Sequence, residues 1–308
     1  MHWKSLILGC ALLFSPGLQG TALAAQAEPQ PAADAAPVEA RPALWKVRDE
    51  DTTIYLFGTI HLLKPNIRWF EGPARTAFDE SQEVVLEVVD HDEAASQDAI
   101  LKRALQLTGL PLSNKLDEPA REAYFAALEE HGASPLLFDR VKPWFAAMTL
   151  AVLPLRELGY SPESGVDRTI QLAASAAGKQ LVALETSDEQ IGFFDEMPEG
   201  LQLTLLNETI AELPKLPQTI EAMIAAWSAG DPEALAALMN ETLESSEEIE
   251  RILLTDRNAR WADWIEARLE RPGTVFMAVG AGHLAGKNSV QAMLAGRDIE
   301  ARLIERKD

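Results

Sequence analysis

Ile54-Tyr-Leu-Phe-Gly-Thr-Ile-His61 is a run of β-branched and aromatic residues that ends in a Gly-x-x-His motif. A second run of the same design, Val275-Phe-Met-Ala-Val-Gly-Ala-Gly-His283, lies near the other end of the chain. Such runs are typical of buried β-strands, so each motif predicts an imidazole just beyond the carboxyl end of a strand. Because α/β proteins build their sites at such strand ends, the two motifs predict one shared site. Gly58 and Gly280 would let the backbone turn sharply out of each strand.

The chain has five histidines, and their surroundings separate them. His61 and His283 follow predicted buried strands. His2 lies in the N-terminal segment, whereas His91 and His131 lie among polar and acidic residues that are typical of a solvated surface. The histidines expected to carry chemistry are therefore His61 and His283, since imidazole is a common metal ligand and proton carrier.

Residues 1–24 have the features of a secretory signal peptide. An apolar stretch over Leu6–Phe14 is followed by Ala22-Leu23-Ala24, a small-x-small cleavage signature. The apolar stretch is too short for a permanent transmembrane helix, which needs roughly 20 apolar residues, and no later segment qualifies. We therefore expect a secreted, periplasmic protein whose mature chain has no transmembrane segment.

Cys10 is the sole cysteine and lies within that signal. The mature chain would then have no thiol for a disulfide, a nucleophile or a thiolate metal site. Ile7-Leu8-Gly9-Cys10 loosely resembles a lipoprotein acylation site, but the very short apolar stretch before it argues against a lipid anchor.

The charge of the chain restricts its partners. Lys and Arg number 27 against 48 Asp and Glu, which gives a formal net charge of −21. Such a chain repels phosphate backbones and anionic headgroups, so neither nucleic acid nor a membrane surface is expected as a partner.

The order of the predicted elements indicates the fold class. Residues 25–42 are rich in Ala, Pro and acidic residues and predict a flexible tether, followed by one domain over residues 43–305. Strands are expected over 44–47, 53–57, 83–89, 181–184, 274–279 and 299–304. Helices are expected over 73–81, 94–107, 119–131, 143–158, 166–177, 201–213, 219–229, 232–239, 247–269 and 288–294. The sequence thus predicts an α/β fold with a central mixed β-sheet built from both chain ends, flanked by helices, and a long, mainly helical middle segment.

His61, Glu87 and His283 form the candidate site. Two imidazoles and one carboxylate at strand ends can hold a divalent ion and leave positions open for water, as a hydrolytic metal site requires. Glu87 lies within a valine-rich strand, where burial of an unpaired carboxylate costs several kcal/mol. It should therefore find a cation, a metal or strong donors, or lie on an exposed edge. Thr59 could hydrogen-bond a ligand or orient an imidazole.

Six motifs in the chain occur in the order seen in the TraB/PrgY/GumN family, which the sequence resembles over about residues 43–305. They are Gly58-Thr59-Ile60-His61, Glu87 after its valine-rich strand, Gly165-Val166-Asp167, Leu184-Glu185-Thr186 with Glu189-Gln190, Leu253-Leu254-Thr255-Asp256-Arg257-Asn258, and Gly280-Ala281-Gly282-His283. The family is similar to the Tiki proteases and, more distantly, to the erythromycin esterase and ChaN-like proteins.

The resemblance implies a divalent-metal-dependent peptidase acting on a peptide or protein, with manganese or cobalt expected rather than zinc. It places His61, Glu87 and His283 in the active site, with Glu87 either a metal ligand or the general base. The family's Arg-Asn pair falls on Arg257 and Asn258. Arg257 would stabilise an oxyanion or anchor a substrate carboxylate, the alternative being an ion pair on a helix surface.

Two acidic residues in these motifs have open roles. Glu185 follows a predicted strand and could enter the site or pair with Arg257. Asp167 follows Gly165 and is expected to cap the helix that begins there.

Functions of other classes would use the same pocket. A binding protein without turnover could capture haem, a metal or a peptide, with His61 or His283 as an axial ligand of the haem. A signalling or inhibitory protein that sequesters peptides is suggested by the pheromone-related branch of the family. The sequence contains no His-Glu-x-x-His helix, no Gly-x-Ser-x-Gly elbow and no phosphate-binding glycine loop, which argues against those chemistries.

Overall fold

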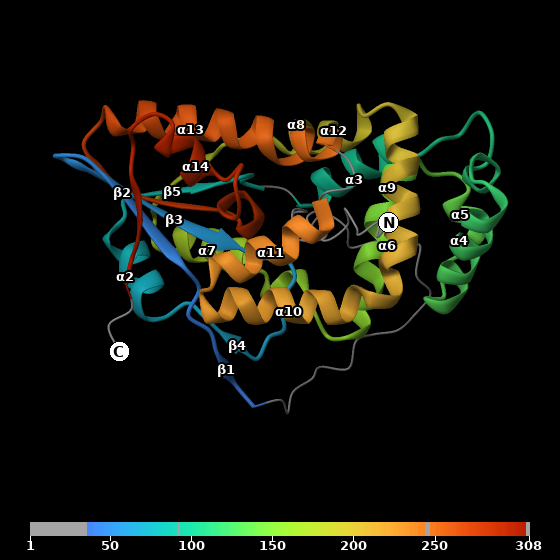
Figure 1. Ribbon diagram of the computed structural model, residues 1–308, viewed down its shortest axis with the longest axis horizontal. Coiled ribbons are helices and arrows are strands. Elements are labelled where there is room, and N and C mark those ends of the chain that lie inside the picture. Colours follow the sequence, from blue (N-terminus) through green and yellow to red (C-terminus); the bar gives the residue numbers. More distant parts are fainter. Residues whose placement is uncertain (1–35, 91–92, 244–246, 306–308) are drawn as a thin grey trace.

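The structure, a computed structural model, describes residues 36–90, 93–243 and 247–305 (Figure 1). The predicted signal peptide, residues 1–24, and His91 lie outside these ranges. The α/β class predicted from the sequence is confirmed. None of the helices within the described ranges is long and apolar enough to cross a membrane.

A six-stranded mixed sheet forms the centre of the molecule. Its strands are β2 (Leu44–Arg48), β3 (Thr52–Thr59), β5 (Glu83–Leu86), β6 (Gln180–Ala183), β7 (Gly273–Gly280) and β8 (Ala301–Leu303), in the order β6-β5-β7-β3-β2-β8. β2 runs antiparallel to β3 and β8, whereas β3, β7, β5 and β6 are parallel. The sheet is built from both chain ends, as predicted, because β7 inserts between β3 and β5.

Helices surround the sheet and form the middle of the chain. They are α2 (Gly72–Glu80), α3 (Glu93–Ala104), α4 (Glu118–Glu130), α5 (Pro135–Phe138), α6 (Pro143–Glu157), α7 (Val166–Ala176), α8 (Ser187–Asp195), α9 (Glu199–Glu212), α10 (Leu216–Ala229), α11 (Pro232–Leu243), α12 (Glu247–Glu250), α13 (Asp256–Leu269) and α14 (Val290–Ala295). α13 and α14 lie on one side of the sheet and α2, α7 and α10 on the other (Figure 1).

The alternation of side chains along β3 explains these layers. Ile54 and Leu56 belong to the apolar cluster that contains Trp261 of α13. Tyr55 and Phe57 point to the opposite cluster, which contains Trp227 of α10. Because successive side chains of a strand point to opposite faces, one apolar run is buried on both sides, as is usual for a strand of a parallel sheet.

A short strand lies within the segment that the sequence predicted as a tether. β1 (Val38–Glu39) pairs in parallel with β4 (Ile67–Arg68), and the Arg41 backbone N–H donates to the Ser228 carbonyl at 2.7 Å. Residues 38–41, predicted as part of the tether, thus bond to other parts of the structure, and the domain bounds 43–305 stay a prediction. The composition of residues 25–42 does not indicate this pairing, because two-residue strands are held by backbone hydrogen bonds rather than by an apolar pattern.

Three further differences from the predictions concern the end of β5, the helix expected over residues 247–269, and α8. β5 ends at Leu86, so Glu87 lies beyond the strand rather than inside it. The helix expected over residues 247–269 is interrupted by a π-helical turn, Arg251–Thr255. α8 was not predicted, although its Thr186-x-x-Glu189 capping box is a known start signal: each side chain bonds the backbone N–H of the other.

Candidate functional site

The two Gly-x-x-His motifs meet at one edge of the sheet. β3 and β7 pair in parallel so that Thr59 lies opposite Gly280. A Cβ atom on Gly58 would lie 3.1 Å from both the Cα and the Cβ of Ala281, which leaves little room for any residue but glycine. The Trp227 indole donates to the Gly58 carbonyl at 2.9 Å and fixes the first of the two turns.

His61 is held against an acidic side chain. Its Nδ1 lies 2.7 Å from Oδ1 of Asp167, in the first turn of α7. The contact forms because the loop before α7 packs on the backbone of the motif. Val166 N–H donates to the Ile60 carbonyl at 2.9 Å, and a Cβ atom on Gly165 would lie only 2.4 Å from the His61 carbonyl oxygen. Asp167 therefore does not cap its helix, as the sequence had led us to expect; Gly165 occupies the cap position.

The environment of His61 favours its protonated form. Burial lowers the pKa of the imidazole, but the close contact with the Asp167 carboxylate, together with the charge of Glu87, outweighs that effect. The net direction is upward from the usual value of 6.5. His61 is thus a stronger base than an exposed histidine.

A small pocket lies in front of His61. It has a volume of about 40 Å³ and is lined by Thr59, His61, Leu86, Glu87, Val88, Asp90, Asp167, Arg168, Gln171, Leu172 and Ala278. His61 Nδ1 and Asp167 Oδ1 have only their 2.7 Å contact with each other, which is not aligned as a hydrogen bond. His61 Nε2 and Thr59 Oγ1 are buried and have no hydrogen-bond partner among the residues that the structure describes. Since buried polar atoms almost always have a partner, these two atoms point to a ligand or a water in the pocket.

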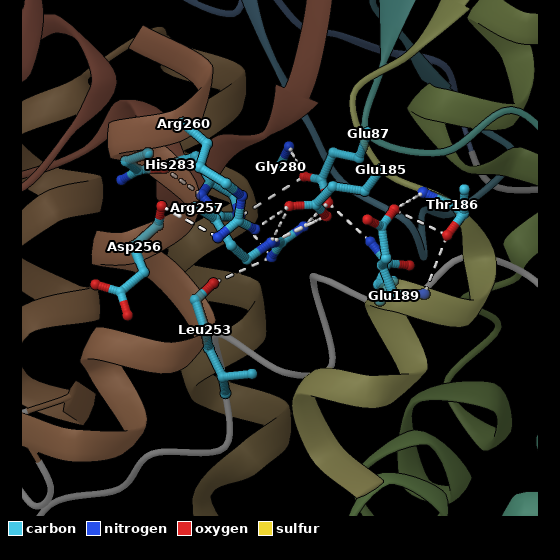
Figure 2. Close-up of polar contacts among 12 residues, drawn as sticks. Glu87, Glu185, Thr186, Glu189, Leu253, Asp256, Arg257, Arg260, Gly280 and His283 are labelled. Carbon is cyan, nitrogen blue, oxygen red and sulfur yellow. Dashed lines mark hydrogen bonds and ion pairs between the residues drawn. The ribbon is translucent and has the colours of Figure 1, made fainter. Parts of the chain in front are cut away.

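Glu87 satisfies its charge within the protein. One carboxylate oxygen accepts the Gly280 backbone N–H at 2.6 Å (Figure 2). The other accepts Arg257 Nη2 at 2.7 Å and Gln190 Nε2 at 3.1 Å. Of the partners considered from the sequence, Glu87 has thus found a cation and strong donors.

Arg257 lies at the centre of this network and is only 2% exposed. Its Nε and Nη2 donate to the two Glu185 oxygens at 2.9 and 2.7 Å, and the exposed Arg260 donates to the same carboxylate at 3.1 Å (Figure 2). The guanidinium lies over the rings of Phe193 and Trp261. Arg257 is therefore a buried member of the site rather than half of a surface pair, and Glu185 pairs with it.

His283 is completely buried beside Arg257. Its Nδ1 lies 2.5 Å from Asn258 Oδ1, and Arg257 Nη1 lies 3.0 Å from its Nε2. Burial first, and then the positive charges of Arg257 and His61, hold the pKa of His283 well below 6.5. His283 is accordingly a neutral imidazole, with its proton on Nδ1 facing Asn258 and its Nε2 accepting from Arg257.

The donor atoms in this arrangement do not form the predicted metal site. His283 Nε2 lies 3.8 Å from a Glu87 oxygen, but both groups direct lone pairs at Arg257. Within the described ranges, no group of three or more His, Cys, Asp or Glu side chains is placed to hold a metal ion. Of the three predicted ligands, His61 is the one whose Nε2 has no protein partner among the described residues. The metal role of His61, Glu87 and His283 stays a prediction.

Two members of the site were not identified from the sequence as such. Gln190 and Asp167 stood in motifs already noted, but no periodicity or composition shows that they contact Glu87 and His61. His131, expected on a solvated surface, is half-buried and lies 3.0 Å from Glu157, away from the site.

Comparisons with known proteins agree with the motifs. A model of the TraB/PrgY/gumN family matches residues 43–302. An uncharacterized protein, YbaP of Escherichia coli K12, is 29% identical over 189 residues, which cover 60% of this chain and 70% of YbaP. An uncharacterized protein of Treponema pallidum is 22% identical over 80% of this chain and 78% of its own. Metalloprotease TIKI1 of Danio rerio is 25% identical over 80% of this chain and 60% of its own. No solved structure matches the chain.

Proposed function

Because the chain belongs to the TraB/PrgY/gumN family, we propose that it is a hydrolase and, more narrowly, a peptidase. Its distant similarity to a metalloprotease supports hydrolysis as the class of reaction. The observation that carries the proposal is the pair of buried atoms, His61 Nε2 and Thr59 Oγ1, that line one pocket without a partner in the described part of the chain. Family membership alone does not establish an activity, so the argument depends on the chemistry of these two atoms.

His61 is the base in this proposal. Asp167 Oδ1 lies 2.7 Å from Nδ1, so the neutral imidazole of this proposal keeps its proton on Nδ1 and leaves the lone pair of Nε2 as the base. His61 itself lines the pocket. A water bound there gives its proton to Nε2 as it attacks the scissile carbonyl. The imidazolium that forms is stabilised by the carboxylate of Asp167, as in other His-Asp pairs. As the C–N bond of the tetrahedral intermediate breaks, Nε2 gives the proton to the leaving amine. The Thr59 hydroxyl donates to the carbonyl oxygen as negative charge develops on it.

The metal-dependent form of this function is the narrower hypothesis from the sequence. There, manganese or cobalt at His61, Glu87 and His283 would supply a water of lowered pKa. The described placement of Arg257 does not fit that ligand set. The hydrolysis proposed above therefore uses the side chains of the protein alone.

A peptide-library digest analysed by mass spectrometry tests the proposal. The full mature chain is assayed after chelation and with added manganese, beside His61→Gln and the control His131→Gln, a histidine remote from the pocket. We expect His61→Gln to lower kcat/KM about 100-fold or more, the contribution typical of a general base, and His131→Gln to leave it unchanged. Equal cleavage by His61→Gln and the unsubstituted protein would show that His61 is not the general base.

A binding function would appear in the same experiment. Peptide that is retained by the protein without any change of mass, in both arms, would favour capture over hydrolysis. The haem version would use His61 or His283 as an axial ligand, and it stays a prediction.

We also propose that the protein is exported to the periplasm by its first 24 residues. N-terminal sequencing of protein expressed from the full chain should begin at Ala25. A protein that retains Met1 would contradict the export signal.

A further inference from the structure

The donors of Arg257 are fully used within the protein. A guanidinium has five N–H groups. Nε donates to Glu185, Nη2 donates to Glu87 and Glu185, and Nη1 donates to the Leu253 carbonyl and to His283 Nε2, each at 3.0 Å or less (Figure 2). The Leu253 carbonyl belongs to the π-helical turn that precedes α13. Such turns are frequent at functional sites, and this one supplies an acceptor to the side chain of Arg257.

Arg257 donates to the acceptor atoms that a metal ion would need as ligands. A metal bound to His283 requires the lone pair of Nε2, since Nδ1 faces Asn258. That lone pair faces Arg257 instead. One Glu87 oxygen accepts the Gly280 N–H and the other accepts Arg257 and Gln190, so a metal bound to Glu87 would have to share an oxygen with at least one of these donors. Two of the three predicted ligands are thus committed to one guanidinium.

The charges of the cluster are balanced without a metal. Glu87 and Glu185 carry two negative charges, and Arg257 and Arg260 contact them with two positive charges. A divalent ion placed between Glu87 and His283 would meet the buried guanidinium at close range, where little solvent screens the repulsion. Without Arg257, the three groups that it contacts, Glu87, Glu185 and His283, would lose their shared cation, and carboxylates and imidazoles are ligands that manganese and cobalt accept.

We infer that Arg257 is the resident cation of this site. Its described position and a divalent ion bound by His61, Glu87 and His283 exclude one another. A protein that keeps Arg257 in place then binds such metals weakly, and removal of the arginine charge creates a metal site. The inference concerns the same residues as the proposed hydrolysis but is judged from metal binding alone, so either proposal can fail while the other stands.

Cobalt titration followed by visible absorption, with manganese titration followed by electron paramagnetic resonance, tests this inference. The full chain is used after chelation, beside Arg257→Met, which keeps a flexible unbranched side chain without the charge, and Arg257→Lys, which keeps the charge. We expect Arg257→Met to bind one equivalent of metal at least tenfold more tightly than the unsubstituted protein and Arg257→Lys. Adding His61→Ala or His283→Ala to Arg257→Met should abolish that gain.

The unsubstituted protein tests the inference even if Arg257→Met does not fold. If it binds one equivalent of cobalt, and both His61→Ala and His283→Ala weaken that binding tenfold, then Arg257 yields to the metal and the inference is wrong. A folded Arg257→Met protein that binds metal no better than the unsubstituted chain would overturn it as well.

Discussion

Glu185→Gln tests whether the buried ion pairs hold the fold together. Glu185 accepts two short hydrogen bonds from Arg257 in a region from which water is excluded, and both side chains are at most 4% exposed. Glutamine keeps the shape but turns one acceptor into a donor that faces the donors of Arg257. Loss of one partner from a buried pair costs about 3–5 kcal/mol.

The structure places Glu185→Gln at the lower end of that range. Arg257 keeps Glu87 as a charged partner, and the contact of Glu185 with Arg260 adds little because Arg260 is half exposed. We therefore expect a loss of about 3 kcal/mol. Arg257→Met leaves two carboxylates buried close together and should cost more, about 5 kcal/mol. If the loss comes from the pair, the double variant should cost less than the sum, by about 2 kcal/mol.

Urea unfolding followed by tryptophan fluorescence measures these differences. In thermal unfolding of a chain of this size, the same loss of about 3 kcal/mol should lower the melting temperature by about 6 °C. Asp263→Asn, which breaks an exposed pair with Arg297, serves as the control and should leave the midpoint unchanged. A Glu185→Gln protein within about 1 kcal/mol of the unsubstituted protein would refute the energetic reasoning.

Two further predictions concern the packing and the titration of the histidine turns. Gly165→Ala should destabilise the protein by about 1–3 kcal/mol in urea unfolding, because its Cβ would collide with the His61 carbonyl, whereas Gly200→Ala, which meets nothing within 4 Å, should not. Below pH 6.5 the unfolded chain protonates His283 but the folded chain does not, so stability should fall with acid by up to about 1.4 kcal/mol per pH unit, and His283→Gln should flatten this slope. Above pH 6.5 the raised pKa of His61 acts in the opposite sense: stability should fall as pH rises through that pKa, and an unchanged slope in His61→Gln would contradict the assignment.

The sequence predicted the sheet better than the site. Strong apolar runs such as 54–57 and 275–279 place β3 and β7 correctly, since burial on both faces leaves a clear pattern. β1 and the end of β5 were missed because backbone pairing, not side-chain periodicity, decides them. The π-helical turn before α13 has no composition signal, and its helix was predicted as continuous.

The motifs identified which residues gather at the site but not how they pair. Glu185 had two possible roles, and the choice depended on whether Arg257 was buried, which only the packing of α13 on the sheet determines. Asp167 was expected to cap a helix because its position fits that pattern. The close packing of Gly165 on the His61 backbone directs it to the imidazole instead. Sequence spacing carries no information on such three-dimensional contacts.

The site thus has two halves that substitutions should separate. Glu87, Arg257 and His283 satisfy one another, so changing them affects stability and chemistry together. Thr59 Oγ1 is buried without a partner in the described chain, and such an atom stabilises a fold poorly. Thr59→Val, which removes only this hydroxyl's polarity, should therefore leave the free energy of unfolding unchanged or raise it by about 1 kcal/mol, while hydrolysis slows. A destabilised Thr59→Val protein would show instead that the hydroxyl serves the fold, and the carbonyl would then lack the donor assigned to it.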